Sequence, residues 1–219
     1  MLALSQEIDM ISDGRVANNI KRHWGEGYGE RVNSFVIVSY SDAGHGSTGL
    51  GDGTREAKDA LRVEAMGSVD ELNCTLGVLQ SSELHDASAL NCLTEVQHDL
   101  FDLGGEIAVP GTVAVNDDRV AWLDSQLAEF NRDLPPLKEF VLPGGGTAAS
   151  AGHIARAVCR RAERSCWALS SSEPMSPMGL RYLNRLSDLL FVLARRFARA
   201  ERGSEPLWNR ARRSDPDGS

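Results

Sequence analysis

Arginine side chains on a predicted helix are the first residues of this chain that could do chemistry. Arg156, Arg160 and Arg164 recur every four residues, so they lie one turn apart on one helix face, and Glu163 lies beside them. Guanidinium groups stacked in this way repel one another unless an anion or a carboxylate lies between them. The pattern indicates a site for an anionic ligand, and a solvent-exposed arginine face is the alternative.

A second polar face is predicted on the next helix, at about residues 178–202. Arg181, Asn184, Asp188 and Arg195 gather on the side opposite its apolar residues. Asparagine is a weak helix former, so Asn184 in the middle of a helix indicates a contact with a ligand or a partner.

A glycine-rich segment satisfies the dinucleotide-binding pattern G-x-G-x-x-G at residues 44–49. A dinucleotide-binding fold needs that pattern to open a helix directly, and the further glycines at 51 and 53 argue against a helix there. Two interpretations stay open: a flexible turn, or a loop whose backbone amides wrap a phosphate. In the second case, Arg55 and Lys58 would supply positive charge.

Five helices are predicted to position these residues, because apolar residues recur at spacings of three and four. The apolar stripes are, in chain order, Leu61, Ala65, Val69, Leu72, Leu76 and Leu79; Leu90, Leu93, Val96, Leu100, Leu103 and Ile107; Val120, Leu123, Leu127 and Phe130; Ala151, Ile154, Val158, Ala162, Cys166 and Leu169; and Leu183, Leu186, Leu190, Leu193 and Phe197. Asn116 or Asp117 is expected to cap the third helix. The predicted fold class is all-α, a five-helix up-and-down bundle preceded by an irregular glycine-rich N-terminal segment.

The chain divides into three predicted regions. Residues 1–45 form an irregular or disordered extension, residues 46–203 the helical bundle, and residues 204–219 a flexible tail. The N-terminus has no apolar region long enough for secretion, and no run of about 18 apolar residues could span a membrane. We therefore expect a cytoplasmic protein.

Charge is unevenly distributed along the chain. It has 23 basic and 31 acidic residues, a net charge of -8, but residues 151–219 hold 13 arginines against 7 acidic side chains. The overall acidity argues against a partner nucleic acid or an anionic membrane. The four cysteines form no C-x-x-C pair, so we expect buried thiols in place of a disulfide or a zinc site.

Five blocks of sequence, taken in order, resemble the PduO type of cob(I)alamin adenosyltransferase, a family of trimeric helical bundles. The blocks are GLGDGTREAK at 49–58, RVEAMGSVDELN at 62–73, FVLPGG at 140–145, RAVCRRAER at 156–164 and YLNRLSDLLF at 182–191. The resemblance implies that ATP donates its 5′-deoxyadenosyl group to the cobalt of cob(I)alamin, which gives adenosylcobalamin and triphosphate. Reduced cobalt is then the nucleophile, so the protein needs no nucleophilic side chain.

The resemblance also implies roles for single residues. The implied ATP-binding residues are Gly46, Ser47, Thr48, Arg55, Lys58, Arg160, Glu163, Arg164 and Asn184. The implied catalytic residues are Arg160, Arg164, Asp70 and Phe140, and those that contact cobalamin are Phe140 and Phe191. Asp70 resembles a carboxylate that pairs with Arg160 across a subunit boundary, and Phe140 resembles the aromatic residue that displaces the lower axial base of cobalamin.

Cofactors and partners follow from the same resemblance. Magnesium would accompany the triphosphate instead of occupying a protein site, and the chain would form a homotrimer. A cobalamin reductase and an adenosylcobalamin-dependent enzyme are possible partners.

The chain departs from the family between Tyr40 and Gly44. Ser41 stands where the family has a basic residue, and Asp42 adds a carboxylate where triphosphate should approach, both of which disfavour phosphate binding. Three interpretations are open: weakened ATP affinity, a catalytically idle relative, or a sequence error upstream of about Gly46. A non-catalytic corrinoid carrier or regulator with an impaired ATP loop is therefore the alternative function.

Overall fold

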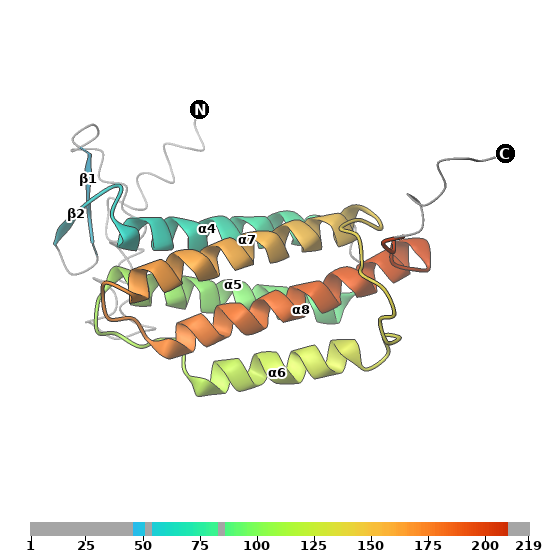
Figure 1. Ribbon diagram of the computed structural model, residues 1–219. Coiled ribbons are helices and arrows are strands. Elements are labelled where there is room, and N and C mark those ends of the chain that lie inside the picture. Colours follow the sequence, from blue (N-terminus) through green and yellow to red (C-terminus); the bar gives the residue numbers. More distant parts are fainter. Residues whose placement is uncertain (1–45, 51–53, 83–85, 210–219) are drawn as a thin grey trace, which may run out of the picture.

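The computed structural model describes residues 46–50, 54–82 and 86–209, which form five long helices and one short β-hairpin (Figure 1). In chain order the elements are β1 (Ser47–Gly49), β2 (Arg55–Ala57), α4 (Leu61–Gln80), α5 (Ala87–Ala108), α6 (Asp117–Asn131), α7 (Thr147–Ser170) and α8 (Pro177–Arg202). The all-α five-helix bundle predicted from the apolar spacing is confirmed. The predicted extension 1–45 lies outside the described residues.

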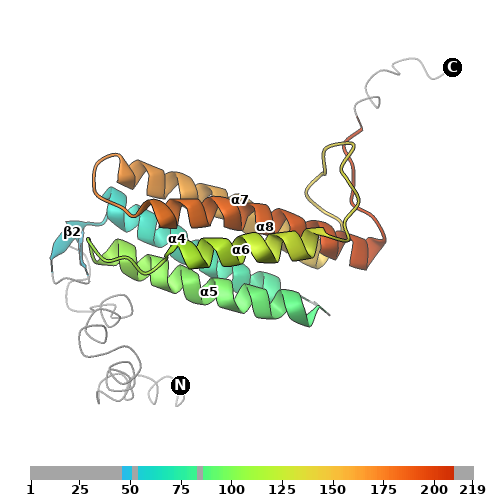
Figure 2. The same ribbon diagram turned by 90° about the horizontal axis from the view of Figure 1, so that it is seen from below.

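Helices alternate in direction along the bundle, so that α4, α6 and α8 begin at one end and α5 and α7 begin at the other (Figure 1). α7 packs against both α4 and α8, while α5 packs against α4 and α6 packs against α8. Seen from below, α6 covers the side of the bundle on which α5 and α8 lie (Figure 2). None of the helices that the structure describes has the length and apolar composition needed to cross a membrane.

Most of the predicted apolar stripes line the core, but two of their residues are exposed. Leu61 is 42% exposed and Ile154 is 59% exposed, so their predicted burial is wrong. Leu61 is the first residue of α4, where the bundle ends. On α7 the buried stripe passes through Ala155, Cys159 and Ala162, because this helix packs between α4 and α8. Ile154 therefore faces outward.

Side chains and a proline fix where three helices begin. The Asn116 side chain accepts a hydrogen bond from the backbone N–H of Arg119 at 3.1 Å, which confirms one of the two predicted caps of α6. Asp86 caps α5 in the same way. Ser176 caps α8, and Pro177 occupies the first turn of that helix, where its missing N–H costs no hydrogen bond.

The glycine-rich segment forms part of a hairpin, which the sequence did not indicate. β1 pairs antiparallel with β2, with Thr48 opposite Glu56, and the Lys58 N–H donates to the Gly46 carbonyl at 2.9 Å. Gly46 has a φ of 68°, a conformation that favours glycine. The hairpin stands beyond the start of α4, at the end of the bundle where α6 and α8 also begin (Figure 1).

The segment after α8 lies against the loop before α7, and two backbone hydrogen bonds connect residues 206 and 208 of the predicted tail to that loop. The Trp208 N–H donates to the Phe140 carbonyl at 2.8 Å, and the Leu142 N–H donates to the Pro206 carbonyl at 2.8 Å. Arg195 also differs from its predicted place on an open polar face. It is 4% exposed and pairs with Glu205 at 2.9 Å, because the returning chain covers it.

Candidate functional site

Glu163 on α7 joins two of the residues predicted to bind ATP. Its side chain is almost buried, and Asn184 Nδ2 on α8 donates a hydrogen bond to Glu163 Oε1 at 3.0 Å. One turn earlier on α7, Arg160 Nη1 lies 2.9 Å from Glu163 Oε2. The carboxylate therefore holds an amide and a guanidinium in place on the surface between α7 and α8.

A hollow of about 300 Å³ adjoins this cluster, between α6, α7 and α8. Its lining residues are Val120, Asp124, Glu163, Trp167, Pro177, Leu180, Arg181, Asn184 and Arg185. Arg185 Nε lies 2.5 Å from Asp124 Oδ1, and Arg181 Nη1 lies 3.2 Å from Asp117 Oδ1. Carboxylates of α6 thus position two arginines at the edge of a partly apolar hollow.

The hairpin brings further predicted phosphate contacts to the same end of the bundle. Arg55 Nη2 donates to Ser47 Oγ at 2.7 Å, so that strand β2 supplies a cation beside the hydroxyl of strand β1. Lys58 follows β2 directly and is exposed. Glu163 lies in the second half of α7 and Asn184 in the first half of α8, which places both toward the hairpin end (Figure 1).

A second hollow, of about 450 Å³, contains both aromatic residues predicted to contact cobalamin. It is lined by Leu137, Lys138, Glu139, Phe140, Val141, His153, Arg156 and Phe191. Phe140 is 77% exposed and meets Trp208 edge-to-face, with 6.2 Å between ring centroids. An exposed aromatic ring, fixed from behind by another, gives this hollow an apolar wall for a large flat ligand.

Asp70 and Arg164 make no side-chain ion pair within the described residues. Asp70 lies on the outer face of α4 and forms no ion pair within the described part of its own chain, whereas neighbouring Glu71 pairs with Arg161 of α7. Arg164 Nη1 donates to the Arg160 carbonyl at 3.0 Å, and the Arg164 side chain is exposed. The predicted pairing of Asp70 with Arg160 is therefore not formed within one chain.

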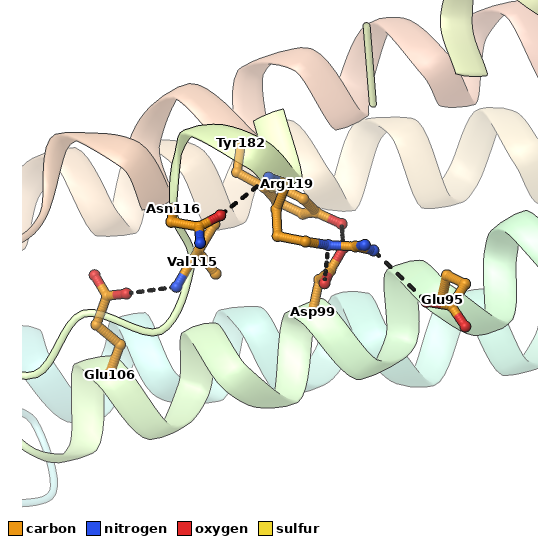
Figure 3. Close-up of polar contacts among 7 residues, drawn as sticks. All are labelled: Glu95, Asp99, Glu106, Val115, Asn116, Arg119 and Tyr182. Atoms are coloured by element: carbon orange, nitrogen blue, oxygen red, sulfur yellow. Dashed lines mark hydrogen bonds and ion pairs between the residues drawn. The ribbon is translucent and has the colours of Figure 1, made fainter. Parts of the chain in front are cut away.

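A polar network among α5, α6 and α8 was not predicted from the sequence (Figure 3). Arg119 contacts both carboxylate oxygens of Asp99 at 2.7 Å, and the Tyr182 hydroxyl donates to Asp99 at 2.6 Å. Burial raises the pKa of Tyr182 well above its usual range, and Asp99 raises it further. The signal for this network was an aspartate within the apolar stripe of α5. Because Asp99 pairs with both Arg119 and Tyr182 inside the protein, these contacts stabilise helix packing.

None of the four cysteines lines either hollow. All four cysteines are free, and burial raises the pKa of Cys92 and of Cys166 to about 12, which keeps both protonated. Cys74 is exposed, contrary to the expected burial of every cysteine. Within the described residues, no cluster of His, Cys, Asp and Glu could hold a metal ion.

The fold defines the class of this protein: an all-α helical bundle with two hollows lined in part by residues of α7 and α8, not a dinucleotide-binding α/β protein. The family model for cobalamin adenosyltransferase matches residues 39–197. The chain belongs to the cobalamin adenosyltransferase family.

Relatives and solved structures agree with this membership. A cobalamin adenosyltransferase of Cupriavidus metallidurans is 50% identical over 181 residues, which cover 83% of this chain and 97% of the relative. A corrinoid adenosyltransferase of Bacillus subtilis is 43% identical over 157 residues, covering 68% and 80% of the two chains. A variant PduO-type ATP:corrinoid adenosyltransferase of Lactobacillus reuteri, complexed with cobalamin and ATP, has 33% identity and a TM-score of 0.69, covering 75% of this chain and 94% of that one.

Proposed function

We propose that this protein transfers the 5′-deoxyadenosyl group of ATP to the cobalt of cob(I)alamin, which gives adenosylcobalamin and triphosphate. The observation that carries the proposal is the Arg160–Glu163–Asn184 cluster, with a hollow beside it and an aromatic hollow on the same two helices. A cobalamin adenosyltransferase with 50% identity supports the same activity. The non-catalytic carrier is not favoured, because the curated relatives carry transferase names.

ATP would bind at the hairpin end of the bundle. Arg160 and Arg164 would lie along the triphosphate, while Asn184 binds the nucleoside side and Glu163 holds the first arginine in place. Arg55 and Lys58, with the backbone of Gly46, Ser47 and Thr48, would complete the phosphate contacts. Magnesium would arrive with the triphosphate, keeping part of its water shell.

Cobalamin would bind in the aromatic hollow, with Phe140 and Phe191 against the macrocycle. Phe140 is mostly exposed, so its ring can occupy the place of the lower axial base. Cobalt is the nucleophile in the reaction, and the protein's contribution is to align the two substrates and stabilise the departing triphosphate.

A homotrimer would supply the missing partner of Asp70. Asp70 is exposed on α4 without an ion pair in the described part of its chain, and Val78 and Ile154 expose apolar surface on α4 and α7. We propose that the exposed surfaces of α4 and α7 contact a neighbouring subunit, where Asp70 reaches Arg160. A cobalamin reductase, an adenosylcobalamin-dependent enzyme and a cytoplasmic location are further predictions.

The activity test is direct. The purified protein, given Mg-ATP and chemically reduced cobalamin, should form adenosylcobalamin, followed by its absorbance change. A correctly folded protein that forms no product at high ATP would contradict the proposal. Calorimetry with Mg-ATP then identifies the alternative, because a carrier binds cobalamin and shows no heat with the nucleotide.

A further inference from the structure

His153 on α7 is a buried polar residue. It is 4% exposed, and neither Nδ1 nor Nε2 has a hydrogen-bond partner among the residues that the structure describes. Buried polar groups in native proteins are nearly always paired, because leaving them unpaired opposes folding. An unpaired imidazole that the fold nevertheless keeps therefore points to a ligand.

The imidazole lines the aromatic hollow. Its ring centroid lies 6.1 Å from that of Phe191, and Phe140 lines the same hollow from the loop before α7. Arg156, one turn further along α7, also lines the hollow, and its buried Nε has no hydrogen-bond partner in the described part of the chain. Two side chains with buried, unpaired nitrogens thus line one hollow together with Phe140 and Phe191.

The charge states of the two groups select the chemistry of the ligand. Burial lowers the pKa of His153, and the Arg156 guanidinium lowers it further, so the imidazole is neutral at neutral pH. A neutral imidazole offers one N–H donor and one nitrogen acceptor, whereas a guanidinium only donates. An ionised carboxylate, which only accepts hydrogen bonds, would leave the imidazole acceptor unpaired. A primary carboxamide matches both groups, because it has an acceptor oxygen and an NH2 donor.

We infer that His153 binds substrate by holding a peripheral carboxamide of the corrin ring, while the Arg156 Nε–H donates to the carboxamide oxygen. The inference rests on the proposed function, since the corrin ring of cobalamin carries several primary carboxamides at its edge. His153 does not ligate cobalt. The carboxamide NH2 donates to the acceptor nitrogen of the imidazole, and this contact orients the macrocycle against Phe140 and Phe191.

The experiment measures binding without turnover. Cob(II)alamin is titrated into the Mg-ATP-loaded full-length protein as wild type, His153→Leu, His153→Gln and, as a control, His98→Leu, an exposed histidine on α5. We expect His153→Leu to raise the Kd for cob(II)alamin about tenfold, because losing a hydrogen bond to the ligand weakens binding by up to about that factor. The Kd for ATP should not change. His153→Gln, which can still donate and accept, should restore most of the affinity, and His98→Leu should match wild type.

A second probe changes the ligand instead of the protein. Cobalamin derivatives with a single peripheral carboxamide hydrolysed to a carboxylate are compared as isomers. Wild type should reject one isomer more strongly than the others, and His153→Leu should lose that preference. If wild type treats all isomers alike, the inference is wrong even if the His153 variants do not fold.

Two other results would also overturn the inference that His153 binds a corrin carboxamide. One is a folded His153→Leu protein that binds cob(II)alamin as wild type does. The other is nitrogen hyperfine splitting in the electron paramagnetic resonance spectrum of bound cob(II)alamin that disappears in His153→Leu, because it would make the imidazole an axial cobalt ligand. Failure of the proposed function looks different: wild type itself would then bind no cobalamin and form no product.

Discussion

Glu163 controls the positions of two side chains at the proposed ATP site. Its Oε1 accepts from Asn184 and its Oε2 contacts Arg160, while the side chain itself is almost buried. A charge-assisted hydrogen bond in such a place contributes more than an exposed one, since water does not compete for the carboxylate. Glu163 therefore links the packing of α7 on α8 to the placement of the charge that triphosphate meets.

Replacing Glu163 by glutamine tests this link. Glutamine keeps one acceptor for Asn184 but turns the other into an amide donor, which cannot bind Arg160. We expect kcat/KM for ATP to fall by about tenfold, equivalent to about 1.4 kcal/mol of transition-state stabilisation. Steady-state kinetics with varied ATP measure this change.

The matched control is Glu129→Gln on α6, which breaks a similar i,i+3 pair with Arg132 away from both hollows. Because that pair is exposed on both sides, its loss should leave kcat/KM unchanged. Equal effects of the two variants would show that Glu163 does not position Arg160 for ATP.

Two glutamates near the C-terminus, Glu201 and Glu205, hold the loop that carries Phe140. Glu201 accepts from the backbone N–H groups of Thr147 at 2.7 Å and Ala148 at 3.0 Å, which caps α7. A Cβ at Gly146 would lie 1.9 Å from the Glu201 carboxylate, so the glycine there permits the cap. Glu205 pairs with Arg195 and Arg199 and fixes the segment that hydrogen-bonds to Phe140.

We predict that Glu205→Gln loosens this segment. Removing one partner of a buried ion pair leaves Arg195 uncompensated, so the free energy of unfolding should fall by about 3 kcal/mol at pH 7. The KM for cobalamin should rise while the KM for ATP stays constant, because the segment supports Phe140. Denaturant unfolding measures the change in stability, and substrate kinetics measure the two KM values. Glu95→Gln is the control, because Glu95 is mostly exposed.

The effect of Glu205→Gln on the free energy of unfolding should depend on pH. Burial alone would raise the pKa of Glu205, but hydrogen bonds from Arg199 and Arg195 hold it below its ordinary value of 4.5. The stabilisation that ionised Glu205 contributes is therefore complete above pH 4.5, and it is lost as the pH falls through the lowered pKa of Glu205 in the folded protein. The difference in stability between wild type and Glu205→Gln should shrink in acid. A constant difference would mean that the pair does not account for it.

These elements also show how far the sequence alone could predict the site. Helical spacing placed Arg160 beside Glu163 and put Asn184 on a polar face, because a regular helix converts sequence distance into position. The same reasoning could not find the pairing of Glu205 with Arg195, which depends on the chain turning back after Gly203. His153 was missed for a related reason: its ring nitrogens lack partners only once α8 and the Phe140 loop are packed around it.

The excess of arginines over acidic residues in positions 151–219 is largely explained by where these arginines lie in the fold. Some, such as Arg195, pair inside the fold, while Arg160 and Arg164 face outward near the proposed ATP site. Asp70 is an acidic residue on the outer face of α4 without such a partner in the described part of its chain. A site completed by a second copy would give Asp70 its cation, and it would make catalysis depend on assembly.

Subunit mixing tests whether the site is shared. Asp70→Ala and Arg160→Ala should each be nearly inactive, because each removes one side of the proposed pair. Co-expressed in equal amounts, they should recover about a quarter of the wild-type activity, since each mixed trimer regains one of its three sites. Activity per trimer, measured after size-exclusion chromatography, gives this fraction.

The control is Asp70→Ala mixed with the double variant, in which no junction between subunits can contain both residues. That mixture should stay inactive, so any recovery there would come from something other than a shared site. If the two single variants also fail to complement while still forming trimers, then Asp70 and Arg160 do not act across a boundary. An active Asp70→Ala protein would remove Asp70 from the site altogether. Recovery in the first mixture alone therefore shows that the proposed active site forms between two chains.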